Sequence, residues 1–328
     1  MEHQMLTVSS PPHIYGKDTT KRRMRDVLIA LTPALLFGAY FYGFQGLMIT
    51  VLAIVAAVAA EALYQRILGK KVTINDLSAV LTGLLLAFNL PPAVPFWIPI
   101  LGSFFAIIVV KQLFGGLGQN FINPALGARA FLLASFPVHM TSWTFSESSY
   151  QIVDGIAGAT YLNILKRAPE FVPDQADYMA VLFGKVGGCI GEVSAAALIA
   201  GGIYLLVRRV INWRIPVFYI GSFAVFAFVF GRQGFFAGEF ILFEMLSGGL
   251  MLGAFFMATD YATSPITPNG KIIFAIGCGF LAVMIRFYSG YPEGVCYSIL
   301  IMNIFVPFID KYTRPRIYGK RKEGRKKA

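Results

Sequence analysis

Ten apolar segments, separated by polar connections, occupy most of this 328-residue chain. A helix needs about 20 apolar residues to cross the hydrocarbon core of a bilayer, and most of these segments approach that length. Only 14% of the residues are charged, whereas a soluble domain carries about 25%. The pattern predicts an all-α polytopic membrane protein with about ten transmembrane helices. The segments run approximately over residues 27–44, 47–65, 77–90, 94–113, 121–138, 187–207, 215–230, 239–258, 272–288 and 293–309.

Two features of these segments predict broken helices. The segment at 77–90 is too short to span a bilayer, and Asn123-Pro124 interrupts the one at 121–138. Five segments precede the long polar stretch 139–186 and five follow it, so any internal repeat is inverted, as in many transporter folds. We therefore expect two inverted five-helix repeats, with candidate breaks at 89–92 and 258–265.

The distribution of basic residues predicts the orientation in the membrane. Ten spans place both termini on one side, and that side receives 22 of the 28 Lys and Arg residues, against four on the other side and two within spans. By the positive-inside rule, both termini are cytoplasmic. The predicted parts are a cytoplasmic arm (1–26), a first repeat (27–138), an extracytoplasmic loop (139–186), a second repeat (187–310) and a basic cytoplasmic tail (311–328).

The net charge of +11 comes from clusters at the ends of apolar segments and from the tail. This distribution favours contact with membrane lipid and gives no indication of nucleic-acid binding. The three cysteines all fall in apolar segments and form no C-x-x-C pair. We therefore expect no metal or iron–sulfur centre held by this chain alone, and we expect the cysteines to be buried as small apolar residues.

Carboxylates inside apolar segments are candidates for function because they are costly in a membrane. Glu192 and Glu244 lie a similar distance into the sixth and eighth segments. They are candidates for ion coupling or proton relay, and the alternative is hydrogen bonding between helices. Glu61, near the inner end of the second segment, is expected to reach the cytoplasmic interface.

Two arginines and one polar stretch are further candidates for binding. Arg129 suits a phosphate or carboxylate, although its position after Asn123-Pro124 predicts the inner half of the membrane. Arg286 is expected to anchor its helix at the interface. Asp260 and Thr263 either line a second binding site or belong to a solvated loop.

The stretch Asp154 to Thr160, with the sequence DGIAGAT, lies in the long polar loop. Small residues surround the Thr160 hydroxyl, which leaves it accessible to a modifying enzyme. By its spacing alone, the stretch is better explained as an ordinary surface loop, since glycine and alanine are common near a threonine.

Together, several motifs make the chain resemble the NqrB/RnfD family, which comprises membrane subunits of the sodium-pumping NADH:quinone reductase and of the Rnf ferredoxin:NAD oxidoreductase. Their order and spacing cover most of residues 20 to 312, and the short N-terminal arm is more similar to the RnfD type. The motifs are NFINPALGARAFL at 120–132, DGIAGAT at 154–160, GEVS at 191–194, LSGGLMLGAFFMATD at 246–260 and YPEGV at 291–295, followed by Asn303 and Asp310.

The resemblance implies that Thr160 carries FMN through a phosphoester bond formed by a separate flavin transferase. Asp154, Gly158 and Ala159 would belong to the recognition motif, whereas Ala157 stands where the family usually has Ser or Thr. A second, non-covalent flavin, riboflavin, would sit near the membrane breaks. The partners would be the other membrane, flavin and iron–sulfur subunits of an Rnf-type complex, because this chain has no nicotinamide site.

The resulting hypothesis is an electron-transfer subunit of an ion-translocating ferredoxin:NAD oxidoreductase. It would help couple electron transfer to Na⁺ or H⁺ movement and would not be catalytic alone. Its location would be the bacterial or archaeal inner membrane, with the Thr160 loop outside the cytoplasm. The alternative is a stand-alone channel or transporter with a five-plus-five inverted repeat.

Overall fold

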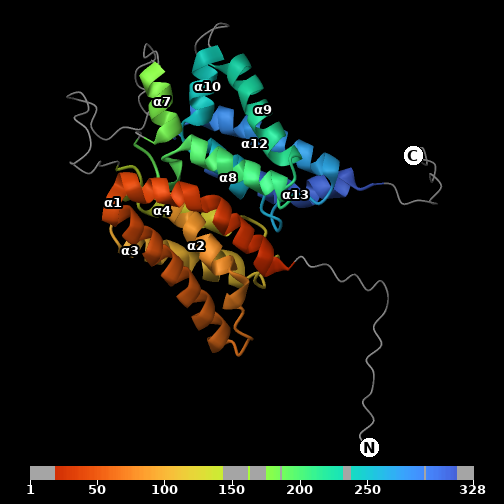
Figure 1. Ribbon diagram of the computed structural model, residues 1–328. Helices are drawn as coiled ribbons and strands as arrows, with labels where there is room; N and C mark the ends of the chain where they lie inside the picture. Colours follow the sequence, from red (N-terminus) through yellow and green to blue (C-terminus); the bar gives the residue numbers. More distant parts are fainter. Residues whose placement is uncertain are drawn as a thin grey trace, which may run out of the picture.

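A computed structural model describes residues 19–142, 162, 175–184, 187–231, 238–291 and 293–315, and every regular element in this part is helical. Each of the ten predicted segments coincides with a helix or with consecutive helices (Figure 1). By length and apolar composition, three of the described helices could cross a membrane, or four if a bent pair is one span. The all-α prediction is confirmed for the described residues, and the ten spans and the inverted repeat stay predictions.

The first two predicted segments form one long helix, α1 (Thr20–Ile67), with a kink. Thr19 caps its first turn, because its hydroxyl accepts a hydrogen bond from the Arg22 amide. Gly43 supplies the kink with φ +60°, a left-handed conformation that residues with a Cβ rarely adopt. The kink divides α1 where the sequence predicted two separate spans.

In the first half, α2 (Ser78–Phe88), α3 (Trp97–Phe104) and η2 (Phe105–Gln112) pack against α1, and α4 (Pro124–Ser135) packs against these three elements. The short 3₁₀ turn η1 (Ile74–Asp76) leads into α2, which ends at Asn89 as the predicted break requires. Next come α3 and the π-helical segment η2. Asn123 caps α4 through the Ala125 and Leu126 amides, with proline at the first helical position. The first half then ends in the single turn α5 (Pro137–Met140).

The second half begins with α7 (Gln175–Phe183), the 3₁₀ turn η3 (Ile190–Glu192) and α8 (Ala195–Val207). It continues through α9 (Arg214–Phe230) and the helix pair α10 (Gly238–Leu246) and α11 (Leu250–Leu252). The π-helical segment η5 (Gly253–Met257), α12 (Pro268–Tyr288) and α13 (Val295–Thr313) complete it. Helix α8 packs directly on α1, so the two halves lie side by side (Figure 1).

The break in the eighth segment differs from the predicted one. The chain bends by 62° between Phe240–Leu246 and Leu250–Met257. The bend lies at Ser247 to Gly249, where Gly248 has φ +70°, so glycine allows a left-handed residue inside an apolar span. The predicted stretch 258–265 instead follows the end of η5, as a connection to α12.

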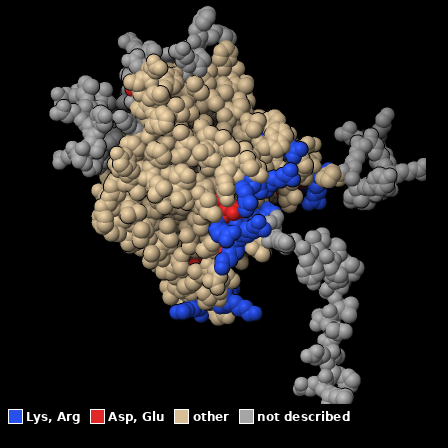
Figure 2. Space-filling model, in the orientation of Figure 1, with Lys and Arg blue, Asp and Glu red and all other residues tan. Residues whose placement is uncertain are grey.

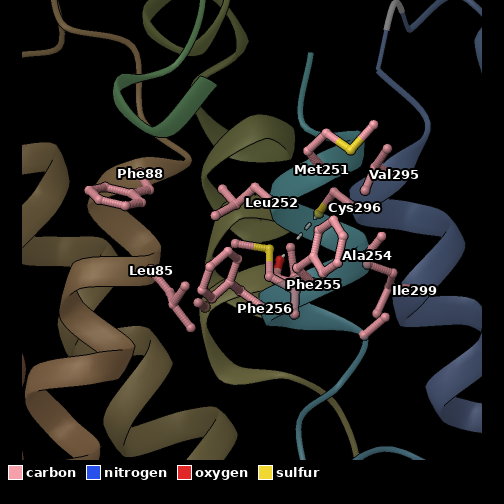
Figure 3. Packing of buried hydrophobic residues seen from close by; sticks show 14 of the residues in the cluster. Leu85, Phe88, Met251, Leu252, Ala254, Phe255, Phe256, Val295, Cys296 and Ile299 are labelled. Carbon is pink, nitrogen blue, oxygen red and sulfur yellow. Dashed lines mark hydrogen bonds between the residues drawn. The ribbon is translucent and has the colours of Figure 1, made fainter. Parts of the chain in front are cut away.

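The interrupted helices meet in the centre of the bundle. The Asn89 side chain, after α2, donates to the Met257 sulfur at 3.7 Å, and the Asn123 side chain, before α4, donates to the Met257 carbonyl at 3.3 Å. Figure 3 shows Phe255 and Phe256 between α2 and α13. Buried apolar packing thus holds η5 between α2 of the first half and α13 of its own half.

The two ends of the described chain lie on one side of the bundle. Arg23, at the start of α1, donates to the Tyr261 hydroxyl at 3.0 Å, and the Asp310 carboxylate, near the end of α13, accepts from the Ile266 amide at 3.1 Å. Both partners belong to the same connection between η5 and α12. The basic side chains in Figure 2 gather on this side and at the tip of the first half, as a membrane orientation signal would require.

Candidate functional site

Arg129 is the centre of a buried cluster of charged and polar groups. It projects from α4, and its guanidinium forms an ion pair with Glu293, just before α13. Its Nη1 donates to the Asn89 Oδ1 at 2.6 Å, and its Nη2 lies 3.6 Å from the Cys189 sulfur. Four chain segments therefore converge on one guanidinium. The sequence had placed Arg129 far from the 139–186 loop, whereas its partners precede α8 and α13, on the side that faces this loop.

Glu192 is the second carboxylate in this cluster. Its Oε1 lies 3.9 Å from Nη1 of Arg129, and its side chain is only 4% exposed. This oxygen has no hydrogen-bond partner among the described residues. One oxygen each from Glu192 and Glu293 and the Cys189 sulfur all lie within 4.8 Å of one another. Glu192 therefore belongs to a compact group that can hold a small cation.

Glu244 lies in a different environment from Glu192. It is buried at the end of α10, where its backbone carbonyl accepts a hydrogen bond of 2.6 Å from Nη1 of Arg286. The Arg286 guanidinium also lies over the Phe223 ring, 4.8 Å from its centroid. Arg286 is thus a buried partner of α10, and the prediction of an interfacial anchor is wrong. Glu192 and Glu244 form no direct contact among the described residues.

A third buried charge cluster lies in the first half. The Lys111 ammonium, on η2, contacts both carboxylate oxygens of Glu61 at 3.0 and 3.1 Å and the Ser78 hydroxyl at 2.6 Å. The Gln112 side chain also donates to Glu61, at 2.7 Å. Because Glu61 is 1% exposed, it does not reach the interface that the sequence predicted. Pairing removes most of the cost of burying both charges.

A pocket opens beside this cluster, next to the first turns of α1. Its cavity volume is about 90 Å³, which is smaller than the roughly 300–1,000 Å³ of typical small-molecule sites. Apolar side chains from α2, α8 and η5 line most of it, including Phe255 and Phe256. The polar lining includes Lys111, Asn120 and Asp260. An aromatic wall with a few polar groups suits a planar, partly polar ligand.

Asp260 and Thr263 are close together at this pocket. The Thr263 hydroxyl donates to an Asp260 carboxylate oxygen at 3.1 Å, and Asp260 itself lines the pocket. In the amide orientation that satisfies both of its neighbours, Asn303 accepts from the Asn123 amide and donates to the Thr263 carbonyl. Burial raises the pKa of Asp260 above its ordinary value, and hydrogen bonds from Thr263 and Asn120 oppose the increase. The connection is therefore a structured pocket wall and not a solvated loop.

The loop candidates Asp154, Gly158, Ala159 and Thr160 lie outside the described residues. The three cysteines are free and buried, as the sequence predicted. Sequence reasoning missed two functional candidates, Glu293 and Lys111. Glu293 stands in the motif YPEGV, where its turn-like flanks gave no sign of burial. Lys111 stands near the end of an apolar segment, where a basic residue usually marks the membrane interface.

The Arg129 cluster and the pocket both place charged or polar groups inside an apolar bundle. The Arg129 cluster presents two carboxylates to one guanidinium, and the pocket presents aromatic and polar groups to a planar ligand. The Cys189 thiol is fully buried and donates to a backbone carbonyl, so the cluster does not present it as an accessible nucleophile for covalent catalysis. The described residues therefore offer a buried charged cluster and a pocket in which a cation or a polar ligand could be held.

Comparison with known proteins gives a consistent result over nearly the whole length. Residues 7–319 match the model of the NQR2, RnfD, RnfE family. The chain is 51% identical over 320 residues to the RnfD-type subunit of the Na⁺-translocating ferredoxin:NAD⁺ oxidoreductase complex of Acetobacterium woodii, covering 97% of each chain. It is 44% identical to the corresponding subunit of the proton-translocating complex of Clostridium ljungdahlii, over 98% of each chain. It is also 38% identical to that of the ion-translocating oxidoreductase complex of Stutzerimonas stutzeri, over 94% of this chain and 95% of that one.

Proposed function

Because the chain belongs to the NQR2, RnfD, RnfE family, we propose that it is the RnfD membrane subunit of an Rnf-type ion-translocating ferredoxin:NAD⁺ oxidoreductase. The observation that carries this proposal is the 51% identity to an RnfD-type protein over 97% of both chains. The helices that could cross a membrane support a location in the bacterial inner membrane. The nicotinamide and iron–sulfur chemistry would then belong to partner subunits.

The protein carries FMN covalently on Thr160, in the extracytoplasmic loop, through a phosphoester bond made by a flavin transferase. The motif DGIAGAT and its place between the fifth and sixth apolar segments support this assignment. A covalent link prevents loss of the cofactor from an exposed site and removes the translational cost of binding. When bound, a flavin supplies one-electron transfer, which the protein positions and tunes.

A second, non-covalent flavin, riboflavin, binds in the pocket beside α1. The pocket lies on the side of the bundle where both ends of the described chain lie, and its aromatic and polar lining supports this proposal. Phe256 would contact the ring, and Asn120 and Asp260 would offer hydrogen bonds to its polar edge. A carrier near each membrane surface would let electrons cross the bilayer.

Ion movement would be coupled to this transfer through the buried carboxylates. Glu192 is the first candidate for that role, since its side chain is buried beside the break in the eighth segment, and Glu244, buried beside Arg286, is the alternative. The names of two relatives specify Na⁺ in one case and the proton in the other, so the ion carried by this protein is left to measurement.

The test is in-gel flavin fluorescence of the denatured chain, together with its intact mass before and after alkali, on protein co-expressed with a flavin transferase. We expect a fluorescent band with the added mass of FMN less one water, lost in alkali and mapped to the Thr160 peptide. Thr160→Ala should be dark, and Thr141→Ala, outside the motif, should keep the signal. Riboflavin should appear in the supernatant of the same denatured sample.

A fluorescent Thr160→Ala variant would contradict covalent attachment at this residue. A stand-alone channel or transporter is the competing function, since the broken span and buried carboxylates are compatible with it. It would give a dark chain in the presence of the transferase and solute flux through the purified protein without redox partners. The similarity to three RnfD-type proteins favours the electron carrier.

A further inference from the structure

The buried charges of the helical core do not all balance. Glu61 and Lys111 form one buried pair, and the buried Asp26 lies 3.4 Å from Arg208, whose side chain is 41% exposed. Glu244 lies beside Arg286, which supplies one opposite charge. Each of these clusters is neutral when its members are ionised.

Among the clusters of paired charges in the described residues, the Arg129 cluster carries a surplus. It contains one guanidinium and two carboxylates, and the three side chains are at most 11% exposed. Counting the nearby Arg286 and Glu244 as well gives two positive and three negative groups, which leaves the same surplus of one negative charge. An isolated charge in an apolar interior is costly, so this cluster is stabilised by taking up one positive charge.

Arg129 donates no hydrogen bond to Glu192 in this arrangement. Its Nη2 is paired with Glu293 and its Nη1 donates to Asn89 at 2.6 Å, so Nη1 approaches Glu192 only to 3.9 Å. The Glu192 Oε1 is consequently buried without a hydrogen-bond partner in the described part of the chain. A proton or small cation between the two carboxylates would satisfy this oxygen.

The donor atoms indicate which kind of cation fits. The Cys189 sulfur donates a hydrogen bond to the Asn89 carbonyl at 3.4 Å, so the group is a thiol in this arrangement and not the thiolate that soft metals require. The remaining donors are carboxylate oxygens, which suit a proton or a hard cation. A single surplus negative charge is neutralised by one monovalent ion.

The site also borders the break in the eighth segment. A Cβ on Gly249, in the break of the eighth segment, would lie 3.0 Å from Oε1 of Glu192, and a Cβ on Gly188 would lie 3.2 Å from Oε2. The backbone of these two glycines therefore approaches both carboxylate oxygens of Glu192 closely, because no side chain lies between them. On the α1 side, the Tyr42 hydroxyl donates to the Gly188 carbonyl at 2.9 Å. Occupancy of the carboxylates is in this way linked to the position of the broken span.

We propose that Glu192 and Glu293 together form the site of one exchangeable monovalent cation, a proton or Na⁺, with Arg129 holding Glu293 in place and Glu244 outside the site. The proposal deepens the ion-coupling part of the proposed function and rests on it. The sequence suggested Glu192 and Glu244 as the pair of carboxylates. The proposal instead pairs Glu192, just before α8, with Glu293, just before α13.

The experiment uses the whole complex, purified through a tag on this chain, in wild-type form and as the isosteric variants Glu192→Gln, Glu293→Gln and Glu244→Gln. Infrared difference spectra over a pH titration record the C=O band of a protonated carboxyl group, and ²²Na⁺ binding is measured at fixed pH. A proton site gives the band without Na⁺ binding, and a Na⁺ site gives saturable binding that competes with protons.

We expect Glu192→Gln and Glu293→Gln each to abolish the band or to weaken Na⁺ binding by about tenfold or more, because a full charge beside a buried cation is removed. Glu244→Gln should keep the signal, and Glu192→Asp should restore part of it. Flavin content and elution as a single species, measured on the same samples, show that each variant is folded.

A wild-type complex with neither signal would overturn the proposal, and so would a signal that Glu244→Gln removes as completely as Glu192→Gln does. The flavin measurement separates this result from the proposed function. A chain with FMN on Thr160 and no cation signal contradicts the cation site alone. A chain without covalent flavin contradicts the electron-carrier role, while its cation binding is still measured directly.

Discussion

At the scale of single residues, the interior of this protein pairs charges instead of excluding them. Glu61 and Lys111 illustrate the point, because both are almost completely buried and each depends on the other. Replacing both members of a buried ion pair with neutral groups is often tolerated, whereas removing one leaves an uncompensated charge. The pair also forms part of the wall of the pocket through Lys111.

Lys111→Met should therefore lower the free energy of unfolding by about 3–5 kcal/mol, because Glu61 is left buried without its cation. The double variant Lys111→Met with Glu61→Gln should recover a large part of that loss. Lys70→Met is the matched control, since Lys70 is exposed after α1. Thermal unfolding in detergent measures the three variants. A double variant less stable than the single one would show that the carboxylate is satisfied without Lys111.

At the scale of elements, glycines decide how closely the two halves approach. A Cβ on Gly201, in α8, would lie 2.2 Å from the Ala30 carbonyl oxygen in α1, far inside contact distance. A Cβ on Gly221, in α9, would meet no atom within 4 Å. Small residues at helix contacts in membranes allow this kind of backbone approach. The α1–α8 contact in turn positions η3 and Glu192 beside the first half.

Gly201→Ala should destabilise the protein by about 1–3 kcal/mol, because α8 must move away from α1 to relieve the overlap. Gly221→Ala makes the same chemical change in open space. It should be neutral or stabilise by up to about 1 kcal/mol, the difference in helix propensity. Thermal unfolding of the two variants side by side is the measurement. Equal effects would mean that the α1–α8 contact is looser than the structure indicates.

At the scale of the whole molecule, the charged surface and the contacts of the chain ends indicate one orientation. Arg23 and Asp310 contact the same connection between η5 and α12, and basic residues gather around it (Figure 2). The other side carries α5 and α7, next to the 139–186 loop. The positive-inside rule assigns the first side to the cytoplasm.

Single cysteines introduced at Lys71 and Thr141 test this orientation, since both residues are exposed and the three native cysteines are buried. A membrane-impermeant thiol reagent should label Thr141→Cys in intact spheroplasts and Lys71→Cys only in inverted vesicles. The unmodified chain is the control for background labelling. The reverse pattern would place the Thr160 loop in the cytoplasm and contradict an extracytoplasmic FMN.

Much of the fold follows from hydrophobic patterning, and the exceptions have local causes. The ends of α2 and the start of α4 were predicted because Asn-Leu-Pro-Pro and Asn-Pro stop or begin helices wherever they occur. The bend at Gly248 was missed because Ser-Gly-Gly inside an apolar run is also tolerated in a continuous helix. The left-handed backbone of Gly248 and the close approach of Gly249 to Glu192 in the folded chain distinguish the two possibilities.

The sequence by itself determined the apolar segments, the family and the surplus of basic residues on one side, because these depend on composition and order along the chain. Tertiary structure alone decided which charges meet. Glu192 joins Arg129 and Glu293, and Glu61 joins Lys111, although these partners are between 50 and 101 positions apart. Electrostatic pairing falls off over a few ångströms, so it depends on distances in space that spacing along the chain does not specify.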